Sequence, residues 1–494
     1  MFRCGILLAI RALKTQQVTG ICITASHNPA EDNGVKLVEP NGEMLCQDWE
    51  GYANELANAE SDEQLAQLVQ AILDREGVAQ GSGTVMVAQD TRPSGPGLAQ
   101  AAAAGVQLLG VTAEMVGLLT TPQLHWMVRS RNAGRAWHEQ AYLQELAGAF
   151  KHVVAGTRPL GQVLHVDCAN GVGAWKLKAI APLLAEAGLA LDLRNTGEGV
   201  LNGACGSDFL QKDKQLPQSF EDITAGTRCC SIDGDCDRLM YFTPQEGGAS
   251  VVLLDGDKIA TLAALLIKDL ISQLPANGSQ PTVGIIQTAY ANGSSSKYIR
   301  EQLGCQVEIT PTGVKYLHEA AHHFDVGIYF EANGHGTVLF SPAFLAKLKQ
   351  VSTESAAARD LLALSELINQ AVGDAISGIL LVEAALRRRQ WGLPEWAALY
   401  TDLPSRQAKV KVSDRTVIVT TDAETRVSEP KGLQALIDAA VAGVPSGRSF
   451  VRPSGTEDVV RVYAEAGTQA EADALAAAVG RLVYRHAGGV GDEP

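Results

Sequence analysis

Short apolar runs alternate with polar, glycine-containing loops along most of this chain. In four places an apolar run precedes a loop rich in Gly, Asp, Asn or Ser, and residues with helical spacing follow. These runs are 21–23, 85–88, 163–166 and 283–286. Strands that alternate with helices are typical of α/β domains with parallel sheets, which bind ligands at the loops beyond the strand ends. The pattern therefore predicts an α/β chain whose chemistry lies in those loops.

The pattern changes after Trp391–Pro394. Two segments of alternating polarity, 407–412 and 417–420, are followed by helical stretches at 433–441 and 470–486. Alternation is typical of antiparallel strands with one buried face. We therefore expect a separate C-terminal α+β domain. Because a domain has about 150 residues, the 494 residues predict three or four domains.

Composition narrows the class of protein. Hydrophobic residues make up 46% of the chain and charged residues 19%, which excludes a disordered chain. The formal charge of −15 gives no sign of a basic nucleic-acid or membrane-binding face, and no apolar run reaches the ~18 residues of a membrane span. The nine scattered cysteines, without C-x-x-C, predict reduced thiols rather than disulfides or a cysteine zinc site. We expect a cytoplasmic protein that binds neither nucleic acid nor membranes.

The loop T-A-S-H-N-P, Thr24–Pro29, exposes a serine directly after an apolar run. His27 and Asn28 follow Ser26, and the Asn-Pro pair forces a turn there. The loop is not the G-x-S-x-G elbow of a hydrolase, because Thr24 and Asn28 occupy the outer positions. Read alone, it is also compatible with a surface turn in which Ser26 caps a helix.

A second loop, S-I-D-G-D-C-D-R at 231–238, carries aspartates at alternate positions between two apolar runs. Asp233, Asp235 and Asp237 repel one another unless a cation lies between them, and carboxylate oxygens favour Mg²⁺ or Ca²⁺. An EF-hand is excluded, because Arg238 and Pro244 stand where it needs Gly and Glu. The alternative is a solvated hairpin turn.

Two further loops carry polar groups suited to a sugar phosphate. F-E-A-N-G-H-G-T, 330–337, offers Glu, Asn and His side chains that can hydrogen-bond to neutral hydroxyls. F-V-R-P-S-G-T-E-D-V-V-R-V, 450–462, gathers Arg, Ser and Thr around a glycine, which predicts a phosphate cradle of guanidinium and backbone N–H groups. Each loop alone can be an ordinary turn. Together the four loops indicate phosphoryl transfer on a sugar.

These motifs resemble those of the α-D-phosphohexomutases, and most closely the phosphoacetylglucosamine mutase family within them. Besides the four loops, the resemblance covers T-T-P-Q-L-H at 120–125, D-C-A-N-G at 167–171, Q-T-A-Y-A-N-G-S-S at 287–295 and T-G-V-K at 312–315. The E-A-N-G-H-G loop separates this family from phosphoglucomutases and phosphomannomutases, which carry G-E-x-S-type loops there.

The resemblance implies a four-domain α/β architecture. Three related α/β domains with mixed sheets and a C-terminal α+β domain surround a central cleft. The expected ranges are 1–150 for the phosphoserine domain, 151–260 for the metal-binding domain, 261–390 for the sugar-binding domain and 391–494 for the phosphate-binding domain.

The resemblance also implies the reaction: interconversion of N-acetylglucosamine 6-phosphate and 1-phosphate, which supplies UDP-N-acetylglucosamine synthesis, with a sugar 1,6-bisphosphate as primer. Ser26 is then the phosphoserine, His27 or Lys36 manages the proton, and Arg238 faces the phosphoryl oxygens. One Mg²⁺ per chain is held by Ser26, Asp233, Asp235 and Asp237. The implied sugar-binding residues are Glu331, Ala332, Asn333 and His335. The implied phosphate-binding residues are Arg452, Pro453, Ser454, Gly455, Thr456 and Arg461.

Two features depart from the family pattern. Cys236 stands where the metal loop usually has Ala or Gly. In the family, a strand with a Y-G-T-x-G-x-R signature and then a helix precede the serine segment. This sequence begins at Met1–Arg3, which resemble part of that helix, so the strand is not in it. The resemblance thus implies that Ile21–Ile23 lack a neighbouring strand and that Ser26 lacks an arginine, which predicts a loosened first domain and reduced turnover.

Three alternatives remain open at this stage. A related hexose-phosphate mutase is the rival in the same class. A truncated chain that binds sugar phosphates without turning them over is a rival of another class. A Mg²⁺-dependent phosphatase is disfavoured, because a second phosphate site then has no purpose.

Overall fold

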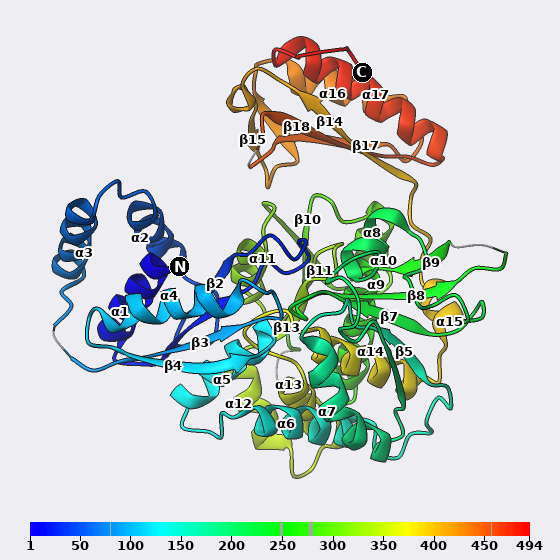
Figure 1. Ribbon diagram of the computed structural model, residues 1–494. Coiled ribbons are helices and arrows are strands. Elements are labelled where there is room, and N and C mark those ends of the chain that lie inside the picture. The colour runs from blue at the N-terminus through cyan, green and yellow to red at the C-terminus, as the bar shows by residue number, and fades with distance from the viewer. Residues whose placement is uncertain (80, 248–249, 276–279, 456) are drawn as a thin grey trace.

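The computed structural model describes residues 1–79, 81–247, 250–275, 280–455 and 457–494. Three mixed α/β sheets follow one another along the chain, and an antiparallel sheet comes last (Figure 1). One of these four sheets falls in each of the ranges 1–150, 151–260, 261–390 and 391–494. The exact boundaries stay predictions.

The first sheet has the strand order β2-β1-β3-β4. Its strands are β1 (Thr19–Ile23), β2 (Val35–Val38), β3 (Thr84–Gln89) and β4 (Thr112–Leu118). β1 is antiparallel to β2 and parallel to β3, and β3 is parallel to β4. Around it are α1 (Phe2–Thr15), α2 (Gln47–Ala57), α3 (Asp62–Glu76), α4 (Gly95–Gln107) and α5 (Thr121–Asn132).

Successive side chains of β1 and β3 point to opposite faces of this sheet, and both faces are buried. Ile21 and Val87 pack into a cluster that contains α1 and α4. Cys22 and Met86 point the other way, into a cluster with α5 and the rest of the molecule. Because successive strand side chains point to opposite faces, β1 is fixed between two hydrophobic layers. The residues that follow β1 therefore start from a rigid position.

The second and third sheets share the order of their first four strands, and the second has β9 as a fifth. The second, in the order β6-β5-β7-β8-β9, contains β5 (Leu164–Asp167), β6 (Leu191–Arg194), β7 (Cys229–Ile232), β8 (Leu239–Pro244) and β9 (Val251–Leu254). The third, in the order β11-β10-β12-β13, contains β10 (Val283–Thr288), β11 (Gln306–Thr310), β12 (Val326–Phe330) and β13 (Gly336–Phe340). In each, three parallel strands are followed by an antiparallel hairpin, β7–β8 or β12–β13.

Helices pack these sheets into a common hydrophobic core. They are α6 (Glu139–Val153), α7 (Gly173–Glu186), α9 (Gly256–Ser272), α10 (Gly293–Glu301), α12 (Pro342–Val351), α13 (Ala356–Leu367), α14 (Ala375–Arg389) and α15 (Leu393–Ala397). Two further helices, α8 (Ser207–Asp213) and α11 (Val314–Ala321), pack in smaller clusters on the second and third sheets. None of the helices in the described ranges combines the length and the apolar character that crossing a membrane requires.

The C-terminal domain follows α15 on a single connecting segment (Figure 1). Its sheet, in the order β14-β18-β17, contains β14 (Ser405–Lys411), β17 (Arg448–Pro453) and β18 (Val459–Glu465), and a short hairpin joins β15 (Val419–Thr421) to β16 (Arg426–Glu429). The helices α16 (Leu433–Ala442) and α17 (Gln469–His486) confirm the predicted α+β domain. Arg448 anchors it to the third domain by donating to the carbonyls of Ala289 (2.7 Å) and Ala291 (2.6 Å).

Three of the four predicted strand–loop–helix units are confirmed, at β3–α4, β5–α7 and β10–α10. The fourth is wrong: the loop after Ile21–Ile23 leads to β2 in an antiparallel hairpin rather than to a helix. The expectation that this strand lacks a neighbour is also wrong, because β1 is hydrogen-bonded to β2 on one side and to β3 on the other.

The four loops chosen for their chemistry share one structural setting. Each connects the two strands of an antiparallel hairpin: β1–β2, β7–β8, β12–β13 and β17–β18. A hairpin holds both ends of its loop with main-chain hydrogen bonds. The fold thus presents each polar loop on a rigid support.

Candidate active site

Ser26 is held in an unusual conformation by residues distant in sequence. It has φ = 51°, in the left-handed region that residues other than glycine rarely adopt. Its N–H donates to Thr24 Oγ1 (3.0 Å), and its carbonyl accepts from Arg92 Nη2 (3.1 Å) and Asn202 Nδ2 (3.0 Å). The same two side chains also donate to the carbonyl of Asn28. This network fixes where the Ser26 hydroxyl points.

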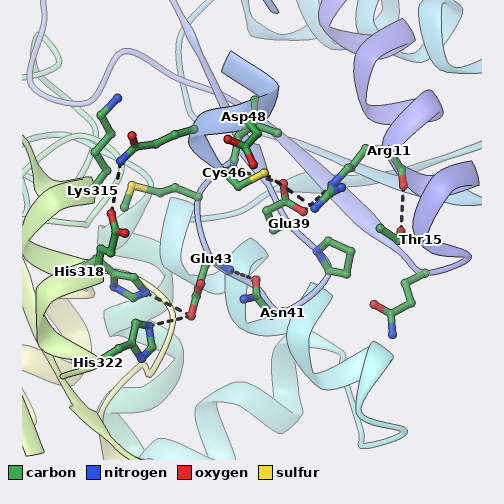
Figure 2. A pocket seen from close by; sticks show the side chains of 16 residues that line it. Arg11, Thr15, Glu39, Asn41, Glu43, Cys46, Asp48, Lys315, His318 and His322 are labelled. Carbon is green, nitrogen blue, oxygen red and sulfur yellow. Dashed lines mark hydrogen bonds and ion pairs between the residues drawn. The ribbon is translucent and has the colours of Figure 1, made fainter. Parts of the chain in front are cut away.

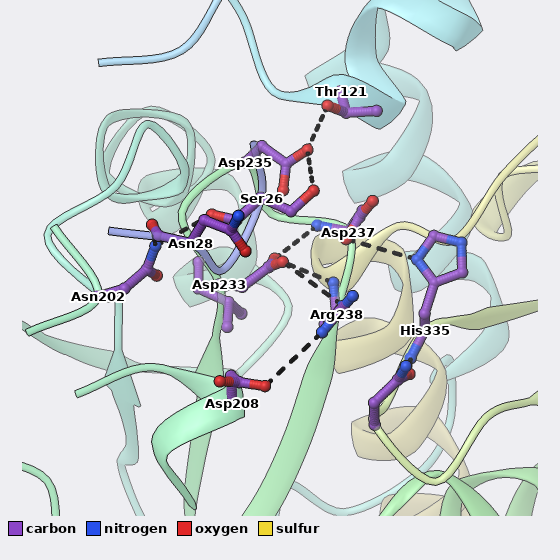
Figure 3. A network of polar contacts seen from close by, with 12 residues as sticks. Ser26, Asn28, Thr121, Asn202, Asp208, Asp233, Asp235, Asp237, Arg238 and His335 are labelled. Carbon is purple, nitrogen blue, oxygen red and sulfur yellow. Dashed lines mark hydrogen bonds and ion pairs between the residues drawn. The ribbon is translucent and has the colours of Figure 1, made fainter. Parts of the chain in front are cut away.

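The three aspartates of the metal loop converge beside that hydroxyl (Figure 3). Ser26 Oγ lies 3.3 Å from Asp235 Oδ2. Asp233, Asp235 and Asp237 are at most 3% exposed, and one ligand oxygen from each lies within 4.8 Å of the others. Each carboxylate keeps one buried oxygen with no hydrogen-bond partner among the described residues. Unsatisfied buried carboxylate oxygens are costly, so the donor set fits a hard divalent cation.

Burial and neighbouring charges strongly shift the pKa values of the ionisable groups in this cluster. Burial, reinforced by the other two carboxylates, raises the pKa of Asp233 well above its ordinary value. Burial acts to lower the pKa of Lys36, but the charges of Asp235 and Asp237 outweigh it and raise that pKa. Lys36 Nζ lies 2.9 Å from Asp235 Oδ2 and also pairs with Asp237. The ammonium thus offsets part of the negative charge that a bound cation would offset.

The other predicted catalytic residues surround this cluster. Arg238 Nε lies 3.9 Å from Asp233 Oδ2 and has no hydrogen-bond acceptor among the described residues, and its Nη1 lies 3.9 Å from Asp208. Burial, followed by the positive charge of Arg238, lowers the pKa of His27. Its Nδ1 is buried without a partner in the described part of the chain. Both side chains therefore keep polar atoms available for a ligand.

The sugar loop touches the metal loop directly. His335 Nδ1 lies 3.4 Å from Asp237 Oδ1, and the Leu239 N–H donates to the Gly334 carbonyl (3.1 Å). Asn333 Nδ2 donates to Glu331 Oε2 (3.3 Å), with Ala332 between them in the turn. Sequence reasoning assigns His335 to sugar hydroxyls, whereas the structure also brings it against a metal carboxylate. The loops of the β7–β8 and β12–β13 hairpins therefore form one continuous polar site.

Gly334 allows this contact, so we predict that Gly334→Ala reduces activity strongly. Its φ is +84°, and an added Cβ lies 2.1 Å from the Leu239 carbonyl oxygen, so the two loops must separate. The left-handed conformation alone costs roughly 1–2 kcal/mol. Gly226→Ala is the matched control, because Gly226 has φ = +81° but no atom within 4 Å of the added Cβ. Equal activity and thermal midpoints for the two variants would contradict the contact.

The fourth loop has the character of an anion site. Arg452 on β17 lies directly opposite Arg461 on β18, and like charges in this position repel each other. Glu424 offsets part of this charge, because its Oε1 lies 3.5 Å from Arg452 Nη1. Ser454 Oγ and Arg461 Nε are buried without partners among the described residues. Pro453 ends β17, and Gly455 accepts at its carbonyl from Arg415 Nη2 (3.1 Å). Thr456 lies outside the described residues, so its place here stays a prediction.

The serine loop, the metal loop and the sugar loop contact one another, whereas the described part of the phosphate loop contacts none of them. Within the described ranges, no hydrogen bond or ion pair links residues 452–461 to Ser26 or to the three aspartates. Arg452 instead donates from Nε to the Tyr290 hydroxyl (3.1 Å). The phosphate loop therefore belongs to a separate face, carried by the C-terminal domain.

Sequence reasoning missed four residues that position the site: Arg92, Thr121, Asn202 and Asp208. Thr121 donates to Asp235 Oδ2 (2.5 Å), and it lies in the T-T-P-Q-L-H segment already noted for its resemblance. Arg92 also bonds to the main chain of the serine loop, at the carbonyl of Asp32 (2.8 Å). Asn202 lies in the loop before α8 and Asp208 in the first turn of that helix, and neither segment has a chemical signature of its own.

Family models match most of the chain. The model for phosphoacetylglucosamine mutase AMG1, domain III, matches residues 255–391. The model for the phosphoglucomutase/phosphomannomutase α/β/α domain I matches residues 6–51 and 46–137, and the model for their C-terminal domain matches residues 409–482. Fold and site thus define an enzyme of the α-D-phosphohexomutase class.

Individual relatives show which family of phosphohexomutases this chain belongs to. Phosphoacetylglucosamine mutase from Arabidopsis thaliana is 48% identical over 98% of this chain and 91% of the relative. A crystal structure of Aspergillus fumigatus N-acetylphosphoglucosamine mutase with GlcNAc-6P and magnesium is 44% identical, with a TM-score of 0.92 over 98% of this chain and 92% of that one. A structure of the same enzyme with glucose 1,6-bisphosphate, also 44% identical, has a TM-score of 0.90 over 99% and 92%. The chain belongs to the phosphoacetylglucosamine mutase family.

Proposed function

We propose that this enzyme interconverts N-acetylglucosamine 6-phosphate and N-acetylglucosamine 1-phosphate through a phosphoserine at Ser26, and so supplies UDP-N-acetylglucosamine synthesis. The observation that carries the proposal is the approach of Ser26 Oγ to Asp235 (3.3 Å), within a three-carboxylate cluster that the E-A-N-G-H-G loop contacts through His335. A phosphoryl carrier, a cation site and a hydroxyl-binding loop thus meet at one place.

Ser26, Asp233, Asp235 and Asp237 are the residues that hold Mg²⁺ in this proposal. The cation supplies neutralisation of the charge that develops on phosphoryl oxygens. The phosphoryl group passes from Ser26 Oγ to the free hydroxyl of the sugar phosphate, and the hydroxyl proton passes to His27, whose lowered pKa favours the neutral imidazole. Lys36 already carries its proton, because the neighbouring carboxylates raise its pKa, so it can only supply a proton. Arg238 faces the transferred group. Transfer of the other phosphoryl group of the bisphosphate back to Ser26 completes the cycle.

The sugar-binding and phosphate-binding assignments are part of the same proposal. Glu331, Ala332, Asn333 and His335 form the loop that receives the sugar hydroxyls. Arg452, Pro453, Ser454, Gly455, Thr456 and Arg461 receive the phosphate that is not transferred. Because the bisphosphate turns over between half-reactions, this site accepts either end of it, which a C-terminal domain on a single connector permits by moving as a unit.

The C-terminal assignment predicts that Arg452→Lys weakens productive binding by roughly 1–3 kcal/mol, the scale of a charge-assisted hydrogen bond. A lysine is a point charge and cannot replace a bidentate fork. The measurement is KM for N-acetylglucosamine 6-phosphate beside the affinity for unphosphorylated N-acetylglucosamine, which should barely change. Arg406→Lys on β14, an exposed partner of Asp473, is the control. Equal losses for both ligands would indicate a folding defect instead.

A coupled assay tests the proposed function. N-acetylglucosamine 1-phosphate and glucose 1-phosphate are compared, each with and without Mg²⁺ and a bisphosphate primer. We expect Mg²⁺-dependent conversion with preference for the N-acetylated substrate. Preference for glucose 1-phosphate would support a phosphoglucomutase, and release of free phosphate would support a phosphatase.

We further place the protein in the cytoplasm, with small sugar phosphates as its ligands. All nine cysteines are free thiols, and reduced thiols are typical of that compartment.

A further inference from the structure

A second cluster of ligand-type side chains lies outside the active site, where the first and third domains meet. Figure 2 shows two imidazoles of the third domain, His318 and His322, directed at the carboxylate of Glu43 from the first. The histidines belong to the sequence H-E-A-A-H, residues 318–322. Residues four apart lie on one face of a helix, and two histidines at this spacing are an established arrangement for binding Zn²⁺.

The distances within the cluster match a metal site better than a hydrogen-bonded one. Glu43 Oε1 lies 3.3 Å from His318 Nε2 and 3.3 Å from His322 Nε2. Tetrahedral zinc with bonds of about 2.0–2.1 Å separates its ligand atoms by about 3.3–3.4 Å. Charge-assisted hydrogen bonds are shorter, about 2.7–2.9 Å. The distance from each imidazole nitrogen to the carboxylate oxygen is therefore the distance expected between two ligand atoms of one zinc ion.

His318 provides an independent observation. Its side chain is 7% exposed, and its Nε2 has no hydrogen-bond partner of acceptable geometry among the described residues. Its other ring nitrogen, Nδ1, lies 2.9 Å from the Tyr329 hydroxyl on β12. Metal-bound histidines commonly use the second nitrogen in this way, which fixes the ring and leaves the first nitrogen for the metal. A buried, oriented and unpartnered nitrogen therefore faces the cluster.

Both sides of the cluster are rigid. The Glu43 turn is held by the first domain, because His125 Nδ1 bonds to the Gly42 carbonyl (2.6 Å) and Asn132 Nδ2 donates to the Pro40 carbonyl (2.7 Å). On the other side, α11 packs its buried face against β10 and β12. A preformed site loses little freedom on binding its ion.

The surroundings leave room for a fourth ligand. The three side chains line a cavity of about 610 Å³ between the two domains. His322 is half-exposed at its rim, so water can reach the cation position. The neighbouring Lys315 is paired with Glu50 (2.8 Å), which offsets its charge.

We propose that Glu43, His318 and His322 form a Zn²⁺ site that joins the first domain to the third. Two imidazole nitrogens and one carboxylate favour zinc over Mg²⁺, which prefers oxygen ligands. The site holds the turn after β2 against α11, whose domain also carries the sugar loop after β12. It is separate from the three-aspartate cluster, and it does not depend on the proposed function.

The test is a metal titration of the full-length chain, freed of metal by a chelator and then kept in excess Mg²⁺ to occupy the aspartate cluster. Co²⁺ is the spectroscopic probe. We expect one equivalent to bind with the visible absorption of a four-coordinate ion, without the near-ultraviolet band of a thiolate ligand, and Zn²⁺ to displace it. Zn²⁺ should also raise the midpoint of thermal unfolding.

Three variants locate the site. Glu43→Gln and His322→Gln should each lower the affinity for Co²⁺ by roughly 100-fold or more, since loss of even an outer partner costs 10- to 100-fold. His323→Gln is the matched control, because His323 is exposed and faces Glu308 instead. It should bind like the parent chain. Absence of the Co²⁺ band, a thiolate band, or tight binding that survives His322→Gln would each overturn the proposal.

Discussion

Replacing Ser26 with alanine should abolish mutase turnover and leave sugar-phosphate binding intact. The variant loses the oxygen that carries the phosphoryl group, and losses on removal of a nucleophile are about 10⁴-fold or more. The fold should tolerate the change. Alanine keeps the Cβ at the left-handed position, and Asp235 Oδ2 retains Thr121 (2.5 Å) and Lys36 (2.9 Å) as partners.

Intact-mass spectrometry separates this role from a structural one. The parent chain should carry one phosphate group that excess substrate removes, and Ser26→Ala should carry none. Ser82→Ala, at an exposed serine before β3, is the control and should keep both the phosphate and the activity. A phosphate that persists on Ser26→Ala would assign the carrier role to another residue.

The residues of the candidate metal loop could be proposed from sequence because their chemistry is local. Asp233, Asp235 and Asp237 alternate between two apolar runs, and the structure gathers them at a hairpin turn. Three carboxylates at that spacing are unfavourable without a cation whatever the rest of the fold. The element that follows Ser26 was not predictable in the same way, because the four residues of β2 are too few to show a helical or a strand period.

Contacts between loops could not be predicted from the sequence. Asn202 reaches the Ser26 carbonyl across 176 positions of the chain, and His335 reaches Asp237 from another sheet. Each contact depends on how two segments from different sheets pack against each other, which the sequence does not show. The same holds for Glu43, His318 and His322: H-E-A-A-H is visible in the sequence, but its carboxylate partner lies in another domain.

Several of the buried polar atoms without partners in the described residues lie in the loops proposed to bind ligands. They occur on all three metal-loop aspartates, on His27 and Arg238, and on Ser454 and Arg461. Burying such groups costs free energy unless something satisfies them. Their occurrence at three of the hairpin loops, β1–β2, β7–β8 and β17–β18, supports the proposal that the cation site and the anion site each hold a ligand.

Asp235→Asn should remove most of the activity, and excess Mg²⁺ should restore part of it. Asp235 is fully buried, and its carboxylate lies beside both Ser26 and the other two aspartates. An amide carries no charge and turns an N–H donor toward Lys36, Thr121 or the cation. Because the proposed role of the cluster is to hold a cation that neutralises phosphoryl charge, we expect a loss of roughly 100-fold or more in kcat/KM and a higher Mg²⁺ concentration at half-maximal activity.

Asp208→Asn is the comparison that isolates the metal role. Asp208 Oδ1 and Asp233 Oδ2 lie equally far from Arg238, 3.9 Å from its guanidinium nitrogens, but Asp208 is not one of the three clustered carboxylates. Its neutralisation removes a charge near Arg238 without removing a cation ligand, so the Mg²⁺ dependence should stay that of the parent chain. If Asp235→Asn instead leaves activity at low Mg²⁺ unchanged, or shifts the Mg²⁺ dependence no more than Asp208→Asn does, the three aspartates do not hold the cation.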